Sequence, residues 1–316
     1  MKNIEPYTSN QYAKIPVICG PTASGKSSLA LSLCEKVQGE LCSCDSMQVY
    51  RHMDIGTAKP TRDEQLKVVH HLIDLIEPSD PYSVAQYRQS ALDCIADCLQ
   101  RGKLPVFCGG TGQYVSALAL GIEYVNISID PSVHNELQNE WIQNGMDSLY
   151  EELLRIDPIS AAKIHPNNVK RVIRALEIYR QTGKTMTYFN QKSLENGPEY
   201  PFALYAIQWD REVLYRRMDE RVDQMLSEGL LDEVCRLKDM GLSADATSLQ
   251  AIGYKELIDY LQKNISLDEA VKQIKQNTRN YGKRQLTWFR NMGKVTWIMP
   301  GDAETVLRDI QANHRK

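Results

Sequence analysis

The sequence predicts an α/β fold in which a parallel β-sheet is flanked by helices and carries a helical insertion domain. Three observations support this prediction. Short apolar runs alternate with helical patterns in the first half of the chain, a glycine-rich turn follows the first apolar run, and residues 131–200 are almost wholly helical in pattern. Strands that alternate with helices indicate βαβ units, because a crossover helix connects parallel neighbours.

Each element follows from its local pattern. The predicted strands are the apolar runs 15–19, 40–44, 71–76, 104–108, 202–209 and 295–299. The predicted core helices include 27–37, 84–101 and a long helix that begins after the capping-box sequence Ser266-Leu-Asp-Glu269 and ends near Asn291. We therefore predict a core of residues 1–130 and 201–316 and an insertion of residues 131–200, in which one amphipathic helix runs from Asn168 to Gln181.

Composition and charge exclude several classes of protein. The 316 residues are 42% hydrophobic and 24% charged, as in ordinary globular domains and unlike disordered or collagen-like chains. The net charge of −3 restricts any nucleic-acid binding to a local basic patch. No apolar run approaches the ~18 residues of a membrane span, and residues 1–14 lack a secretory signal, so we expect a cytoplasmic protein without membrane contact.

The eight cysteines fit a reducing compartment. No Cys-x-x-Cys pair occurs in the sequence. Cys94 and Cys98 are four residues apart and share one face of a predicted helix. We interpret them as small buried hydrophobic side chains, with a zinc or redox site as the alternative. His70 and His71 lie in an apolar run and are interpreted as structural.

The glycine-rich turn carries the strongest motif. It fits the pattern G-x-x-x-x-G-K-[S/T] between a predicted strand and a predicted helix, as a phosphate-binding P-loop requires. Backbone N–H groups and the helix N-terminus cradle phosphates, the lysine adds a charge, and the last hydroxyl can bind Mg²⁺. We therefore expect a P-loop NTPase-like fold, with Mg²⁺ at Ser27. The predicted diphosphate-binding residues are Gly20, Pro21, Thr22, Ala23, Ser24, Gly25, Lys26 and Ser27.

Two further strand ends carry polar groups. Asp45 ends the second predicted strand, where a carboxylate can act as a base or bind Mg²⁺ through water; the alternative is that it caps the next turn together with Ser46. The strand 104–108 runs into Gly109-Gly-Thr-Gly112, whereas nucleotide hydrolases have an acidic Mg²⁺ ligand there. Thr111 in this turn could approach a phosphate or a base, and an ordinary strand-to-helix turn is the alternative.

These motifs, in this order, make the sequence similar to the tRNA dimethylallyltransferase family, which is also called the tRNA isopentenyltransferase family. The similarity spans about residues 14–299. The segments that carry it are Gly20–Ser27, Asp45–Arg51, Met53–Pro60, Gly109–Tyr114, Ile164–Glu177, Arg221–Met225, Gln250–Glu256 and Thr278–Trp288. The departures are small: Gln113 stands where the family often has Leu, and Gly282 where Ala is common.

The resemblance implies transfer of a dimethylallyl group from its diphosphate to N6 of the adenine at tRNA position 37, next to the anticodon. The P-loop would then bind the diphosphate leaving group rather than ATP, and Mg²⁺ would be the cofactor. Asp45 matches the family's proposed general base. Thr111 and Arg221 would hold the diphosphate and the developing charge. The implied partners are dimethylallyl diphosphate and a tRNA anticodon stem-loop, and we expect a monomer.

Two basic patches support an RNA partner. Residues 270–294 contain seven basic and no acidic residues, and a second patch spans residues 163–184. We expect the patches to grip the stem-loop from opposite sides while the target base leaves its stack. The predicted tRNA contacts, from the patches and the resemblance together, are Asp45, Ser46, Met47, Gln48, Gly112, Lys170, Arg171, Val172, Ile173, Arg174, Gln250, Ala251, Ile252, Gly253, Tyr254, Lys255, Arg279, Lys283 and Arg284.

Two other functions compete with this interpretation. The P-loop alone favours a small-molecule or nucleotide kinase, which the basic patches and the long resemblance disfavour. A non-catalytic RNA-binding nucleotide switch would need a nucleobase-reading motif, and none is found in the sequence.

Overall fold

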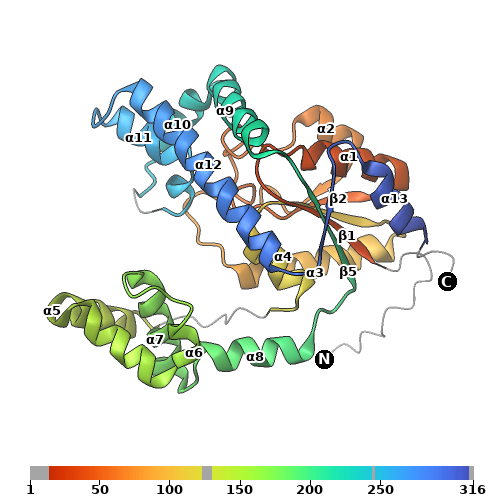
Figure 1. Cartoon of the computed structure of the whole chain (residues 1–316). Coiled ribbons are helices and arrows are strands. Elements are labelled where there is room, and N and C mark those ends of the chain that lie inside the picture. The colour runs from red at the N-terminus through yellow and green to blue at the C-terminus, as the bar shows by residue number, and fades with distance from the viewer. Residues whose placement is uncertain (1–13, 123–129, 244–245, 313–316) are drawn as a thin grey trace. The chain divides into compact units, whose positions relative to one another are not determined.

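The computed structural model describes residues 14–122, 130–243 and 246–312 (Figure 1). The chain forms two compact units, of which one is Met1–Ala119 with Tyr200–Lys316 and the other is Leu120–Glu199. The boundary predicted near residue 130 adjoins residues 123–129, which lie outside the described ranges.

The first unit is built on a six-stranded, wholly parallel sheet with the strand order β3-β2-β4-β1-β5-β6. This arrangement confirms the predicted α/β fold. The strands are β1 (Ile15–Cys19), β2 (Glu40–Ser43), β3 (His70–His71), β4 (Pro105–Gly109), β5 (Phe202–Ile207) and β6 (Val295–Ile298). Because the strands are parallel, the carboxyl ends of β1, β2 and β4 meet at one edge of the sheet, where ligands of such folds bind.

The third strand is shorter than predicted. The apolar run 71–76 was expected to be a strand, but β3 ends at His71, and Leu72 and Asp74 have left-handed backbones with φ of 64° and 53°. Asp74 does not continue the strand, and its carboxylate forms an ion pair with Lys59. Ile76 returns to form one isolated bridge with Tyr50.

Helices cover both faces of the sheet. On one face, α1 (Lys26–Val37) and α13 (Ala303–Ala312) bury residues such as Leu33 and Val306. On the other face, α3 (Val84–Gln100) and α4 (Gly112–Ala119) bury residues such as Ile95 and Leu118. The short helix α2 (Arg62–Lys67) precedes β3.

A further group of helices follows β5. It consists of α9 (Arg211–Ser227), α10 (Leu230–Asp239), the 3₁₀ turn η1 (Ser248–Gln250), α11 (Tyr254–Leu261) and α12 (Leu267–Asn291). These elements share a core with Val49, Tyr50 and Met53 from the segment after β2. Helix α12 begins as the sequence predicts, because the Ser266 hydroxyl accepts the Glu269 N–H at 3.2 Å.

The second unit is helical and has its own core. Its helices are α5 (Pro131–Ile156), α6 (Pro158–Ala161), α7 (Val169–Thr182) and α8 (Met186–Asn196). Helix α7 begins after the N-cap Asn168 and ends at Gly183, whose φ of 68° suits a helix C-terminus. Leu137 and Leu153 of α5 pack against Leu176 of α7 in this core.

Within the described ranges, no helix combines the length and apolar character that crossing a membrane would require.

Candidate active site

The P-loop connects β1 to α1 at the carboxyl edge of the sheet. Gly20, Ala23 and Gly25 have left-handed φ values of 129°, 60° and 87°, which curl the backbone between the strand and the helix. Side chains from after β5 fix two of its carbonyl groups. The Trp209 indole N–H donates to the Ser24 carbonyl, and the Arg217 Nε–H donates to the Ala23 carbonyl, both at 2.9 Å. The loop is therefore held in place before any ligand binds.

Inside this loop lies a buried hydroxyl without a partner. The Ser24 side chain is 1% exposed, and its Oγ forms no hydrogen bond with the described part of the chain. Buried hydroxyl groups are nearly always paired, because an unpaired one loses its hydrogen bonds to water without replacement. An oxygen-rich anion in the loop would supply the missing acceptor.

Two cations and one carboxylate act on each other beside the loop. Lys26 is half-buried, and desolvation lowers its pKa; Arg221 lowers it further, while Cys108 and Asp45 oppose the shift. Burial also lowers the pKa of Arg221, again against the opposing effect of Asp45. Both cations thus carry a desolvation cost that a bound polyanion would offset. The structure brings Lys26, Arg221 and Asp45 together as the sequence interpretation requires.

Asp45 follows β2 and has a structural role as well as a free oxygen. Its Oδ1 accepts the Met47 N–H at 2.9 Å, so the capping alternative is correct for this atom. Its Oδ2 accepts no hydrogen bond from the described residues. One carboxylate oxygen therefore fixes the turn, and the other is available for a substrate.

Thr111 supports that turn from the neighbouring loop. Its N–H donates to the Cys44 carbonyl at 3.1 Å, and its Oγ1 accepts the Ser46 N–H at 2.9 Å. The same hydroxyl donates to Ser46 Oγ at 3.3 Å. These bonds join the ends of β2 and β4 on either side of Asp45.

The turn after β4 has glycines because a side chain there would clash with other parts of the protein. A Cβ on Gly109 would lie 2.3 Å from the Cys44 carbonyl oxygen, and one on Gly110 would lie 2.0 Å from Gln285 Nε2. Gln285, which is 5% exposed on α12, donates from Nε2 to the Gly110 carbonyl and accepts the Thr22 N–H at Oε1, both at 2.9 Å. One side chain thus bridges the P-loop and the second glycine-rich turn. Sequence reasoning gave Gln285 no role, and no local signal sets it apart from the other amide side chains of α12.

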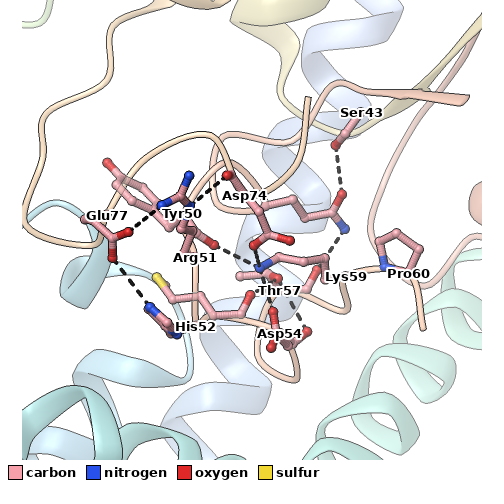
Figure 2. A network of polar contacts seen from close by, with 12 residues as sticks. Ser43, Tyr50, Arg51, His52, Asp54, Thr57, Lys59, Pro60, Asp74 and Glu77 are labelled. Carbon is pink, nitrogen blue, oxygen red and sulfur yellow. Dashed lines mark hydrogen bonds and ion pairs between the residues drawn. The ribbon is translucent and has the colours of Figure 1, made fainter. Parts of the chain in front are cut away.

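The segment Met53–Pro60 is held by a polar network, which Figure 2 shows. The Lys59 side chain is 3% exposed and forms ion pairs of 2.6 Å with both Asp54 and Asp74. Its ammonium group also donates to the Tyr50 carbonyl at 2.9 Å. Gln48 was predicted to contact tRNA, but its amide accepts the Ser43 hydroxyl proton at 2.8 Å and donates to two carbonyl groups of the segment.

Part of the segment Gln250–Lys255 is also structural. Tyr254, another predicted tRNA contact, is fully buried, and its hydroxyl donates to Glu233 Oε1 at 2.6 Å. Glu233 accepts the N–H groups of Asp54, Ile55 and Gly56 as well. The Tyr254 side chain therefore belongs to the core. Gln250 and Lys255 are exposed, whereas Ala251 and Ile252 are half-buried and Gly253 is buried.

The basic run on α12 meets acidic side chains from α9. Arg279 forms an ion pair with Asp219 at 2.6 Å, and Lys275 forms one with Asp223 at 2.7 Å. The positive charges of Arg279 and Lys275, on the surface predicted to be purely basic, are therefore balanced by these carboxylates. Lys283 and Arg284 are exposed, as are Lys272, Arg290 and Lys294.

In the second unit, the predicted patch divides between surface and core. Lys170 and Arg171 are exposed on α7, and Arg174 forms an ion pair with Glu177 at 3.3 Å. Val172 and Ile173 are 0% and 3% exposed and belong to the core of this unit, so their side chains are not available to RNA. A contact of these two residues with tRNA would therefore involve the main chain.

Comparisons with known proteins agree with this geometry. A sequence profile described as IPP transferase matches residues 48–292. A tRNA dimethylallyltransferase of Geobacillus thermodenitrificans is 48% identical over 291 residues, covering 92% of each chain. A second relative of that name, from Carboxydothermus hydrogenoformans, is 44% identical and covers 91% of this chain and 92% of its own.

Solved structures show the same relationship. The crystal structure of the tRNA isopentenylpyrophosphate transferase of Bacillus halodurans superposes with a TM-score of 0.69 at 42% identity, over 95% of this chain and 98% of that chain. A eukaryotic dimethylallyltransferase acting on tRNA superposes with a TM-score of 0.73 at 29% identity, over 96% of this chain and 77% of that one. A P-loop with an unpaired buried hydroxyl, Asp45 and two desolvated cations therefore sit in a chain that belongs to the IPP transferase family of tRNA dimethylallyltransferases.

Proposed function

We propose that this protein transfers a dimethylallyl group from dimethylallyl diphosphate to N6 of the adenine at tRNA position 37. The observation that carries the proposal is the P-loop site, where the Ser24 hydroxyl is buried without a partner and two desolvated cations interact with Asp45. Such a site suits a polyanionic leaving group. The names of the relatives supply the prenyl donor and the tRNA acceptor.

The reaction breaks the bond between the allylic carbon and a diphosphate oxygen, and it forms a bond from that carbon to N6. Negative charge builds on the departing diphosphate. Lys26, Arg221 and the P-loop N–H groups would stabilise this charge, and because they are fixed before the reaction, little reorganisation is needed. The Gln285 bridge would keep the P-loop in register with the turn that contains Thr111.

Asp45 would act on the nucleophile. The exocyclic amine of adenine is a poor nucleophile because its lone pair is delocalised into the ring. The Oδ2 atom would orient this amine and accept its proton, while Oδ1 remains bound to the Met47 N–H. The adenine must leave its stack to reach this edge of the sheet.

Mg²⁺ is the expected cofactor, and the residues present fit it. The exposed Ser27 hydroxyl at the start of α1 is a hard oxygen ligand of the kind that Mg²⁺ prefers. When bound, the ion would neutralise charge on the diphosphate.

The exposed cations would bind the RNA backbone. Lys283 and Arg284 on α12, Lys255 on α11, and Lys170 and Arg171 on α7 are the candidates with exposed side chains. A tRNA substrate supports a cytoplasmic location.

The experiment incubates the full-length protein with unmodified bulk tRNA and dimethylallyl diphosphate, ATP or GTP, and follows the nucleosides by mass spectrometry. We expect N6-dimethylallyl adenosine with dimethylallyl diphosphate only, and competition by inorganic diphosphate. Phosphorylated RNA or tRNA-dependent ATP hydrolysis at turnover rates would instead support a kinase or a nucleotide switch and would overturn the proposal.

A further inference from the structure

A cluster of cysteine and histidine side chains lies on the side of the sheet that α3 covers. None of these residues belongs to the P-loop. Cys42 comes from β2, and Cys94 and Cys98 lie one turn apart on α3. The three sulfur atoms all lie within 4.8 Å of one another, and those of Cys42 and Cys94 are 3.4 Å apart. In a tetrahedral zinc site with Zn–S bonds near 2.3 Å, sulfur atoms are about 3.8 Å apart.

A histidine completes the donor set. His71 in β3 is the direct register partner of Cys42, so in a parallel pair both side chains point to the same face. Its Nε2 lies 3.9 Å from Cys98 Sγ and 2.6 Å from Glu40 Oε2, and the donor atoms of Glu40, His71 and Cys98 lie within 4.8 Å of one another. The His71 side chain is 25% exposed, which gives an ion a route from solvent.

The geometry points to a structural zinc site formed by the thiolates of Cys42, Cys94 and Cys98 and the Nε2 atom of His71. On binding, each thiol releases its proton to solvent. The Nε2 proton that His71 shares with Glu40 is released as well, while Nδ1 is protonated from solvent, so that a neutral imidazole offers Nε2 to the metal. Glu40 stays fixed, because Arg101 donates to its two carboxylate oxygens at 2.5 and 2.7 Å. Soft thiolate and imidazole donors select zinc over the Mg²⁺ expected at the P-loop.

The arrangement distinguishes this cluster from the other buried cysteines. Cys34, for example, packs among apolar side chains of α1 and β4. The cluster instead brings together three thiols and an imidazole from β2, β3 and α3. Simple packing of small hydrophobic side chains would not require such a set of metal-binding groups. A disulfide between Cys42 and Cys94 would require an oxidant and would leave Cys98 and His71 without a role.

A zinc ion here would tie three elements together. Strand β3 pairs with β2 through two residues only, and β2 leads directly to Asp45. The metal would thus link the two-residue strand β3 to β2, the strand that positions the proposed base. This inference is independent of the proposed activity.

The test measures the zinc content of the full-length protein, purified under reducing conditions without chelators, and titrates the metal-free protein with Co²⁺. We expect about one equivalent of zinc per chain, and with Co²⁺ the absorption bands of a tetrahedral thiolate site. Cys94→Ser, Cys98→Ser and His71→Gln should each weaken metal binding by about 100-fold or more. A zinc chelator should lower the melting temperature of the wild type and leave that of Cys94→Ser unchanged.

Two control variants keep the test decisive. Cys235→Ser removes a half-buried thiol on α10, outside the cluster, and should keep full zinc content. Glu40→Gln should keep the thiolate bands, because Glu40 is not a proposed ligand. Cys94 is half-buried, so its substitution is the one least expected to prevent folding. A wild type that binds neither zinc nor Co²⁺ when reduced, or a Cys42–Cys94 disulfide in the protein as isolated, would overturn the proposal.

Discussion

Cationic side chains lie in two regions of the first unit, and the regions differ in how their charges are balanced. In the segment Met53–Pro60, Lys59 is balanced by Asp54 and Asp74 and donates to a backbone carbonyl. At the P-loop, Lys26 and Arg221 form no ion pair with the described residues. Lys26 donates to the Pro21 carbonyl at 3.2 Å, Asp45 acts on both cations, and the same loop holds an unpaired hydroxyl. A balanced cation holds the fold together, whereas an unbalanced set predicts a ligand of opposite charge. Substitutions can separate these two roles.

The largest effect is expected at Asp45. Asp45→Asn keeps an oxygen that can accept the Met47 N–H but removes the base, so kcat for prenyl transfer should fall by ~10²–10⁴-fold. Donor affinity and melting temperature should stay close to those of the wild type. Steady-state kinetics and a thermal melt on the same preparation measure both. Retained turnover together with a lower melting temperature would mean that Asp45 is only a cap.

Lys26 should have the next largest effect. Lys26→Met removes one preorganised charge from the leaving group, so transfer should fall by at least ~10²-fold, with little loss of stability. Inorganic diphosphate should also bind more weakly, which isothermal titration would detect. If diphosphate affinity were unchanged, the P-loop would not be the donor site.

Lys59→Met is the matched substitution in the balanced region. It leaves the carboxylates of Asp54 and Asp74 without their shared cation and the Tyr50 carbonyl without its donor. We expect the free energy of unfolding to fall by about 1–3 kcal/mol, as measured by urea denaturation. Donor affinity should not change. A variant of normal stability that binds the donor poorly would place Lys59 in the site instead.

The smallest effect separates two basic residues of α12. Lys283 is exposed and is expected to contact one phosphate. In Lys283→Ala, the slope of log K (the tRNA association constant) against log salt should therefore become less negative by about 0.7–0.9, the contribution of one phosphate contact. Arg279 is paired with Asp219, so Arg279→Ala should leave that slope unchanged. Lys170→Ala tests α7 in the same assay. Equal slopes for the two α12 variants would show that pairing with Asp219 does not withhold Arg279 from RNA.

Local patterns predicted most of the fold, because strands, helix caps and the P-loop depend on residues close together in sequence. The early end of β3 could not be predicted from local patterns, because the partner of Asp74, Lys59, lies fifteen residues earlier in the chain. The pairing of Arg279 with Asp219 escaped notice for the same reason, since 60 residues separate the partners.

The site shows the same division. Lys26 could be found from the P-loop motif, and Asp45 from its place at the end of an apolar run. Gln285 could not, because its partners Thr22 and Gly110 lie 263 and 175 residues away. Resemblance marks a segment and does not say which of its side chains point inward, as the buried side chains of Val172, Ile173 and Tyr254 show.

The position of Gln285 has a consequence for how the two substrates influence each other. Lys283 and Arg284, which face solvent, immediately precede Gln285, which clamps both donor loops. A shift of α12 on contact with RNA would therefore be transmitted to the P-loop within one helical turn. Thermodynamic linkage then requires that tRNA and the donor change each other's affinity by the same factor. Gln285→Leu would weaken this coupling while leaving the outer cations in place.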